Sequence, residues 1–459
     1  MEKTAKRFAF NAGQIVVLGF LIGNVVGTAL LMLPISSNKP GSTDLLTASF
    51  TSVSALSLTG LGVVDTHVHW SIFGQAVIAL LIQVGGFGVM AVGSLLVLLL
   101  TQKISFHTKL TSTKEQSALG LDDFRTLLLR LFQISVVIEL TLTVVLALNF
   151  WLNHDVPLPE ALWHGLFHSI SAFNNAGFSS FEGGLLRFAS DPIVLYSIST
   201  VAIIGGLGFP VLIELSRRLI KRLRLANFRP AELGSRLSLT SRIVIQFSAI
   251  LLVAGAIFTA VIEWNNPGTL GPLGVWDKIA NSWFASAMSR TNGFAALDYG
   301  QFNKETLLGT DILMFIGGGS AGTSGGLRIT TFAVLIFVVV AEIRGDSRVN
   351  AGNRRLGVSV QRTAVALAML SIFWVAAFVM IIQLITDFDT DQILFEVISA
   401  FSTCGLSTGI TPLLPPAAKI MLMIMMFIGR IGLVLVASSL AQRLRPMTYK
   451  LPKERPLIG

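Results

Sequence analysis

Leu58-Thr59-Gly60-Leu61 is the first of four short stretches that place a glycine directly before a large apolar residue. The others are Asn175-Ala176-Gly177-Phe178, Thr291-Asn292-Gly293-Phe294 and Thr403-Cys404-Gly405-Leu406. The four glycines recur at intervals of about 115 residues, and a repeat of this kind constrains the architecture more than any single motif does. The pattern therefore predicts a chain built from one unit used four times.

Three flanking features recur with the glycines. Ser-Ala precedes the glycine in three copies, as Ser54-Ala55, Ser171-Ala172 and Ser399-Ala400, whereas the third copy has Ala287-Met288. Further upstream, each copy carries an acid: Asp44, Glu160, Asp277 and Asp391. Downstream, each copy has a second glycine cluster, at 85–88, 205–208, 317–320 and 429–432. These features predict four repeats, at 1–103, 104–222, 223–343 and 344–459.

Composition indicates an integral membrane protein. Hydrophobic residues make up 53% of the chain and charged residues only 13%, which is too apolar for an ordinary soluble domain. Stretches long enough to span about 30 Å of hydrocarbon predict an all-α polytopic fold with eight transmembrane helices, two per repeat. Their approximate bounds are 14–34, 71–100, 126–152, 192–216, 242–264, 308–341, 363–386 and 417–441.

Lys and Arg concentrate in alternate segments between these spans and at both termini. The positive-inside rule therefore predicts that both termini are cytoplasmic. The net charge of +9 then reflects membrane topology and contact with anionic lipid rather than nucleic-acid binding. A single cysteine, Cys404, excludes an internal disulfide and a cysteine-based metal cluster.

In each repeat, a segment between the acid and the glycine is too short to cross the membrane. Asp44 to Ser57 covers only roughly 21 Å as a helix, so we expect it to enter the membrane and return, with the acid at its N-terminus. The glycine then lies in non-helical backbone, which a membrane tolerates only inside protein or along a water-filled path. Four such segments around one axis predict a central pore with pseudo-four-fold symmetry, lined by rings of carbonyl oxygens that coordinate a monovalent cation.

The alternative interpretation is that these are packing glycines, which are common in membrane helices. A single copy would favour that reading, whereas four copies in phase with a short helix favour the filter. One glycine per copy also predicts fewer ordered ion sites than a potassium channel has. The predicted filter residues are Leu58, Thr59, Gly60, Asn175, Ala176, Gly177, Thr291, Asn292, Gly293, Thr403, Cys404 and Gly405.

The sixth predicted span contains Gly317-Gly318-Gly319-Ser320-Ala321-Gly322-Thr323-Ser324-Gly325-Gly326. A continuous helix is disfavoured there, because each glycine costs about 1 kcal/mol relative to alanine. We expect a broken helix and a gating loop just cytoplasmic of the filter. Close helix crossing is the alternative, and it accounts better for the other three glycine clusters.

Arg430 takes the position of a glycine in the fourth cluster, deep in a predicted span. Intramembrane charge is costly and by default functional, so we expect Arg430 beside the gating loop; a structural ion pair is the alternative. For Glu139, in the third span, we favour a structural role. His164 and His168 are spaced four apart like a metal pair, but no third ligand lies nearby, so we expect no transition metal.

These motifs resemble those of the Trk/Ktr/HKT superfamily of cation-translocating subunits, which carry four M1–pore–M2 repeats. The resemblance is carried by residues 57–65, 171–178, 317–326 and 428–432, covers essentially the whole chain, and is strongest to the KtrB-type branch. It implies potassium uptake across a bacterial plasma membrane, the four filter glycines named above, the 317–326 gating loop and Arg430 at the gate. Gly60 suits potassium, whereas Asn292 and Cys404 depart from the commoner small apolar residues.

The resemblance further implies a homodimer on a cytoplasmic KtrA-type RCK ring that binds the regulatory nucleotide, with sodium as a stimulant. One rival interpretation is a sodium-coupled or sodium-transporting carrier with a broken helix; four same-sense repeats argue against it. Another is an intramembrane serine protease, since Gly322-Thr323-Ser324-Gly325 fits G-x-S-G. That enzyme needs a histidine base, and no histidine follows His168, so we expect no enzyme.

Overall fold

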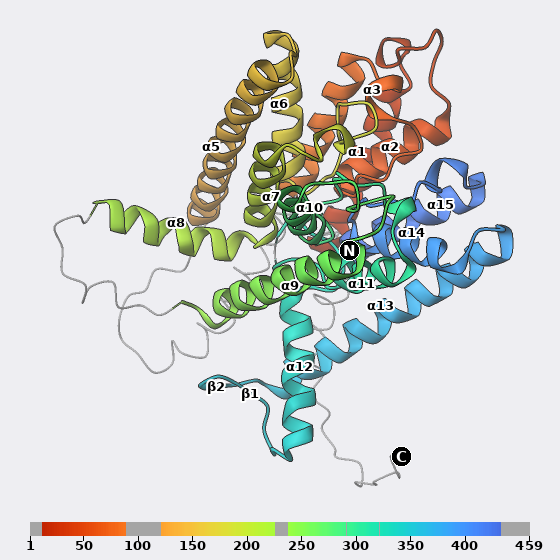
Figure 1. Cartoon of the computed structure of the whole chain (residues 1–459). Coiled ribbons are helices and arrows are strands. Elements are labelled where there is room, and N and C mark those ends of the chain that lie inside the picture. The colour runs from red at the N-terminus through yellow and green to blue at the C-terminus, as the bar shows by residue number, and fades with distance from the viewer. Residues whose placement is uncertain (1–11, 89–120, 225–236, 291, 321, 433–459) are drawn as a thin grey trace, which may run out of the picture.

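The structure is a computed structural model that describes residues 12–88, 121–224, 237–290, 292–320 and 322–432. These residues are almost all helical, and strands are confined to one small hairpin within them (Figure 1). The elements used below are α1 (Ala12–Leu31), α2 (Leu45–Ser57), the helix Ile72–Gly88, α5 (Leu121–Asn153), α6 (Leu158–Phe173), α7 (Pro192–Gly206), α8 (Phe209–Arg224), α9 (Leu239–Glu263), α10 (Val275–Met288), α11 (Lys304–Phe315), α12 (Ile329–Arg344), β1 (Asn350–Ala351), β2 (Arg354–Arg355), α13 (Val358–Ile385), α14 (Thr390–Ser402) and α15 (Pro416–Phe427).

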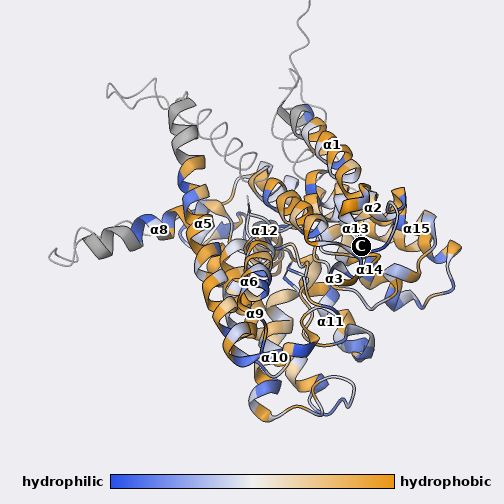
Figure 2. Ribbon diagram, turned by 90° about the horizontal axis from the view of Figure 1, so that it is seen from above, coloured by the Kyte–Doolittle hydropathy of each residue, from blue (hydrophilic) through white to orange (hydrophobic). Residues whose placement is uncertain are grey.

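Within the described residues, three helices are long and apolar enough to cross a membrane: parts of α5, α9 and α13. The number rises to four if the bent pair of α7 and α8 is one span. These long helices carry hydrophobic residues along their outer faces (Figure 2), among them Val144, Leu152, Ile257, Val261, Met380 and Leu384, all of which are exposed. Exposed apolar side chains on helices of this length indicate contact with lipid.

The fourth predicted span, 192–216, is not one straight helix. α7 ends at Gly206, α8 begins at Phe209, and the two helices are bent by 106°. Gly208 between them has a φ of +89°, a left-handed conformation that favours glycine. Pro210 follows in the first turn of α8, where a proline cannot donate the hydrogen bond that would continue α7.

The sixth predicted span is broken, as its glycines predict. α11 ends at Phe315 and α12 begins at Ile329. The intervening segment closes on itself through the N–H of Gly317, which donates to the carbonyl of Leu327 at 2.8 Å, and the N–H of Ile329, which donates to Gly318 at 3.1 Å. Ala321 of this segment lies outside the described residues, as do the ends of the second and eighth predicted spans.

Four short helices, α2, α6, α10 and α14, correspond to the predicted re-entrant segments. They contain 13, 16, 14 and 13 residues. Each packs against the helix that precedes it: α2 on α1, α6 on α5, α10 on α9 and α14 on α13. The sequence repeat therefore recurs in three dimensions as a long helix followed by a short one.

The acid of each copy stands at the start of its short helix, as predicted. Asp44 is the N-cap of α2, and its carboxylate accepts the N–H of Thr47 at 3.0 Å. Glu160, Asp277 and Asp391 lie in the first turns of α6, α10 and α14. A carboxylate at this end stabilises a helix because it faces the positive end of the helix dipole.

Candidate functional site

The four repeated glycines meet in one closed ring of backbone. A Cβ built on Gly60 would lie 2.3 Å from the carbonyl oxygen of Ala176, far inside contact distance. The same relation continues around the ring, from Gly177 to the oxygen of Asn292 at 2.4 Å, from Gly293 to that of Cys404 at 2.1 Å, and from Gly405 back to that of Thr59 at 2.1 Å. All four positions thus require glycine, because any side chain would enter the neighbouring copy.

The backbone angles of the four glycines impose the same requirement. Their φ values are +90°, +69°, +79° and +99° for Gly60, Gly177, Gly293 and Gly405. Glycine adopts these angles without steric cost. Leu58, Asn175 and Thr403 also have positive φ, at 59°, 56° and 49°. Leu58 and Thr403 cap α2 and α14, and Asn175 follows the cap of α6, so in three copies a left-handed residue turns the chain into the ring.

Carbonyl oxygens of the ring are left without donors. In the described part of the chain, the carbonyl oxygens of Thr59, Ala176 and Asn292 accept no hydrogen bond, although all three residues are fully buried. Buried backbone carbonyls are nearly always paired, so three unpaired ones in a single ring point to a ligand that replaces a hydrogen-bond donor.

In three copies the residue six positions before the ring glycine holds the turn through its backbone carbonyl. The N–H of Thr59 donates to the carbonyl of Ser54 at 2.8 Å, and those of Ala176 and Cys404 donate to Ser171 and Ser399 at 2.8 and 2.9 Å. In the third copy the equivalent N–H, that of Asn292, donates to the carbonyl of Met288 at 3.0 Å, and that of Gly293 donates to the same carbonyl at 3.2 Å. The repeated positions in the sequence therefore correspond to a repeated backbone turn in the structure.

Side chains of the ring point sideways and join neighbouring copies. The amide of Asn292 donates to the carbonyl of Ala172 at 2.9 Å, and the thiol of Cys404 donates to that of Met288 at 3.4 Å. The side chains of the two residues that depart from the expected small apolar type therefore bond carbonyls of Ala172 and Met288, outside the ring. Thr291, the remaining predicted filter residue, lies outside the described residues.

Three of the second glycine clusters pack on the short helices. A Cβ on Gly85, Gly205 or Gly429 would lie within 2.2 Å of a carbonyl oxygen, that of Leu56, Phe173 or Phe401 respectively. Each of these carbonyls stands four residues before its ring glycine. Close packing thus accounts for these three clusters, whereas in the third copy Gly317 meets the carbonyl of Gly325 within its own loop.

The third cluster forms a loop wedged between two copies. The N–H of Gly319 donates to the carbonyl of Gly206 at 2.8 Å, and a Cβ on Gly325 would lie 2.3 Å from the hydroxyl oxygen of Thr403. The loop therefore contacts the end of α7 on one side and the last turn of α14, next to the ring, on the other.

Arg430 lies against this loop, as the sequence predicts. Its guanidinium donates to the carbonyl of Thr323, and only 1% of Arg430 is exposed. It stands in a short π-helix, Ile428–Gly432, a form that often marks functional sites. Within the described residues it forms no ion pair, and its Nε and Nη2 have no partner.

Glu139 has a structural environment beside the second copy of the ring. It is only 6% exposed and accepts hydrogen bonds from Gln83 at 3.1 and 3.2 Å and from Asn174 at 3.3 Å. Asn174 immediately precedes the ring segment. Glu139 thus has a structural environment, as expected. Through Asn174 it also contacts the segment that leads into the ring, which sequence reasoning missed.

Sequence reasoning also missed several buried charged residues, among them two acids and an arginine. Glu396 on α14 is 1% exposed and accepts hydrogen bonds from Ser407, Thr408 and Thr411, which follow the fourth ring glycine. Glu263 is fully buried at the end of α9, and Arg290 donates to the carbonyl of Ser248 at 3.0 Å. Charged residues inside apolar stretches were the available signal.

The two spaced histidines are occupied by hydrogen bonds. His164 bonds Ser180 through Nδ1 at 2.7 Å, and His168 bonds Ser179 through Nε2 at 2.9 Å. Among the residues that the structure describes, no group of three or more His, Cys, Asp or Glu side chains could hold a metal ion.

The fold and the site together define a helical membrane protein in which four short helices converge on one ring of backbone carbonyls. The chain belongs to the TrkH family of cation transport proteins, whose sequence pattern matches residues 2–444. It is 36% identical over 431 residues to the Ktr system potassium uptake protein B of Bacillus subtilis, covering 94% of this chain and 93% of that protein.

Other relatives cover equally long stretches. The Ktr system potassium uptake protein B of Vibrio alginolyticus is 32% identical, with 97% of this chain and 94% of the relative covered. The potassium/sodium uptake protein NtpJ of Enterococcus hirae is 31% identical, with 97% of each chain covered. The crystal structure of the potassium transporter TrkH from Vibrio parahaemolyticus superposes with a TM-score of 0.68 at 16% identity, over 97% of this chain and 87% of that one, which shows a common fold.

Proposed function

We propose that this chain takes up potassium ions across the plasma membrane through a selectivity filter formed by the backbone at 58–60, 175–177, 291–293 and 403–405. The observation that carries the proposal is the closed glycine ring, with the unpaired carbonyls of Thr59, Ala176 and Asn292. Carbonyl rings of this kind replace the hydration shell of a potassium ion.

The four short helices support a cation as the occupant. Each ends within three residues of the start of its ring segment, and its acid stands at the opposite end. The C-terminal end of a helix carries a partial negative charge, so four such ends stabilise a cation at the ring. Relatives over 30% identical are named for potassium uptake, and NtpJ for potassium and sodium, which makes potassium the first choice and sodium the alternative or coupled ion.

The loop 317–326 and Arg430 form the proposed gate. The loop touches Thr403, whose backbone belongs to the ring, and Arg430 binds it through the carbonyl of Thr323. A loop with so many glycines changes conformation at low steric cost. A guanidinium facing the path repels cations while it stays there and ceases to do so when the loop moves.

The wider assembly follows from the same proposal. Eight membrane helices in four M1–pore–M2 repeats, with the repeat bounds given above, place both termini in the cytoplasm. The functional unit is a homodimer on a cytoplasmic KtrA-type RCK ring, whose bound nucleotide controls the gate. The positive charge of the predicted cytoplasmic segments supports this orientation.

A proteolytic function has little support in the geometry. The hydroxyl of Ser324 is fully buried and has no hydrogen-bond partner in the described part of the chain, whereas a serine nucleophile needs a base within reach. Replacing Ser324 with alanine tests this alternative: we expect transport to survive, and loss of a proteolytic activity would contradict the transporter assignment.

The experiment that tests the proposed function is potassium and sodium uptake into cells that lack their own potassium uptake systems. The chain is expressed alone and then together with a KtrA-type partner. We expect potassium-selective uptake that the partner increases. Sodium uptake without potassium preference would overturn the substrate, and absence of any cation flux in both conditions would overturn the proposal.

A further inference from the structure

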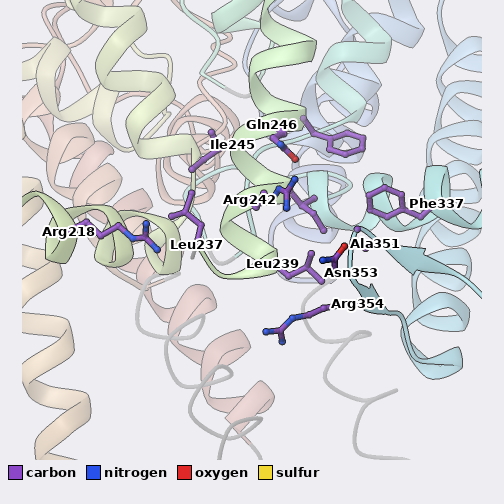
Figure 3. Close-up of a pocket in the computed structure, with 13 residues that line it drawn as sticks. Arg218, Leu237, Leu239, Arg242, Ile245, Gln246, Phe337, Ala351, Asn353 and Arg354 are labelled. Atoms are coloured by element: carbon purple, nitrogen blue, oxygen red, sulfur yellow. The ribbon is translucent and has the colours of Figure 1, made fainter. Parts of the chain in front are cut away.

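A large cavity opens away from the ring, between α8, the beginning of α9, α12 and the β1–β2 hairpin (Figure 3). Its volume is about 870 Å³. Three arginines from three different elements line it: Arg218 of α8, Arg242 of α9 and Arg354 of β2. Its other walls are largely apolar and include Ile243, Phe247 and Phe337.

The cavity carries unmatched positive charge. Arg218 pairs with Glu214 at 3.1 Å, and Glu214 is itself held by Ser238 and Ser241 at the start of α9. Within the described part of the chain, neither Arg242 nor Arg354 forms an ion pair or a side-chain hydrogen bond. Among the described residues, two cations that line one cavity therefore lack an anion.

The apolar lining of the cavity extends along α9 beyond Arg242. Phe247 lies five residues beyond Arg242 on α9, roughly 7–8 Å along the helix at 1.5 Å per residue, and Phe337 of α12 lines the same cavity. Figure 3 shows Arg242 between Ile245 and Phe337, with Arg354 farther from both. A ligand that fits must be anionic at one end and apolar over at least this length.

We propose that this cavity binds an acidic phospholipid, with its phosphate between Arg242 and Arg354 and an acyl chain along Phe247 and Phe337. The membrane side on which the lipid sits rests on the proposed function, because the proposed topology places the α8–α9 and α12–α13 connections in the cytoplasm. Cytoplasmic leaflets are anionic and attract arginines at the membrane surface. A free nucleotide or phosphate would leave the apolar wall uncovered.

The bound lipid would join two helices that adjoin the 317–326 loop. α12 begins where the loop ends, at Ile329, and α8 follows Gly208, whose Cβ would lie 2.6 Å from the carbonyl oxygen of Ser320. A ligand between α8 and α12 thus contacts both elements that hold the loop. The site therefore stands next to the proposed gate while remaining separate from the ring.

Native mass spectrometry of the full-length protein, titrated with phosphatidylglycerol or with phosphatidylethanolamine of the same acyl chains, tests the proposal directly. We expect phosphatidylglycerol to bind more tightly. The Arg242→Gln, Arg354→Gln double variant should lose about 30-fold in that affinity, since each arginine near the surface contributes about 1 kcal/mol. The matched control is Arg348→Gln with Arg355→Gln, which removes the same charge from residues that do not line the cavity; its affinity should be unchanged.

Three outcomes would overturn the proposal. Equal binding of the two lipids would show that charge does not select the ligand. Displacement of phosphatidylglycerol by inorganic phosphate at the same concentration would show that the acyl chain contributes nothing to binding. Dissociation of a dimer in the double variant, with lipid affinity unchanged, would assign the arginines to a second copy of the chain. Because binding is read without ion flux, its failure is distinguishable from failure of the proposed transport function.

Discussion

Replacing Gly177 with alanine places a methyl group inside the backbone ring. The new Cβ would lie 2.4 Å from the carbonyl oxygen of Asn292 and 3.1 Å from the Cα of Gly293, whereas ordinary contact begins at 3.4 Å. The oxygen of Asn292 must therefore retreat by about 1 Å, since ordinary packing tolerates no such overlap. Gly177 also has a φ of +69°, which an alanine adopts at a cost of roughly 1–2 kcal/mol.

The displaced carbonyl sets the size of the effect. A hydrogen bond to a charged group contributes about 1.5–3 kcal/mol, and we take a carbonyl–cation contact as comparable. Loss of one such contact corresponds to a decrease of about 10- to 150-fold in ion affinity. We therefore expect rubidium uptake at low concentration to fall by that factor and preference over sodium to shrink.

The assay is rubidium uptake into proteoliposomes that contain equal amounts of folded protein, with sodium as competitor. Gly19→Ala is the matched control, because a Cβ on Gly19 meets nothing within 4 Å and the residue lies within α1; its uptake should equal that of the wild type. A Gly177→Ala protein that takes up rubidium at the wild-type rate and selectivity would refute the filter assignment.

Three other outcomes follow from the same account. Gly60→Ser should admit more sodium, because a side chain at position 60 would collide with the carbonyl oxygen of Ala176 and displace it from the ring. An unchanged potassium preference in a sodium competition assay would contradict this. Shortening the 317–326 loop should raise flux and weaken control by the partner, and unchanged flux would argue against a gate. Burial raises the pKa of Asp191, but hydrogen bonds from His154, Asn149 and the backbone of α7 outweigh it, so the folded-state pKa is lowered. Its stabilisation is therefore present above the unfolded-state pKa and lost as pH falls through the lower folded value, below about pH 4; an Asp191→Asn variant should show a smaller acid-induced loss of melting temperature than the wild type, and an equal loss would exclude this role.

Much of the site was predictable because its determinants are local. The acid at each helix start, the short helix and the glycine that follows are encoded within about 17 residues of each copy, and capping and backbone angles depend on near neighbours. The broken sixth span was predictable for the same reason, since six of the ten residues at 317–326 are glycines.

Closure of the ring depends on distant residues and was therefore only a hypothesis at the level of sequence. Gly405 meets the carbonyl of Thr59, which lies at the other end of the chain. Partners of Glu396 and Glu139 are likewise set by packing between elements.

The bend after α7 was missed because the residues on both sides of Gly208 are apolar, so the sequence predicts one continuous span there. Mean hydropathy does not register a glycine with positive φ followed by a proline. The β1–β2 hairpin was also missed, although Gly352-Asn353 between its paired strands is a recognised turn signal.

Anomalous diffraction from crystals of the protein grown in rubidium tests the central claim most directly. The account predicts a rubidium peak at the centre of the ring, coordinated by the carbonyl oxygens of Thr59, Ala176, Asn292 and Cys404, that persists when sodium is added at the same concentration as rubidium. A peak elsewhere in the protein, with no ion at the ring, would contradict the claim that this backbone selects potassium.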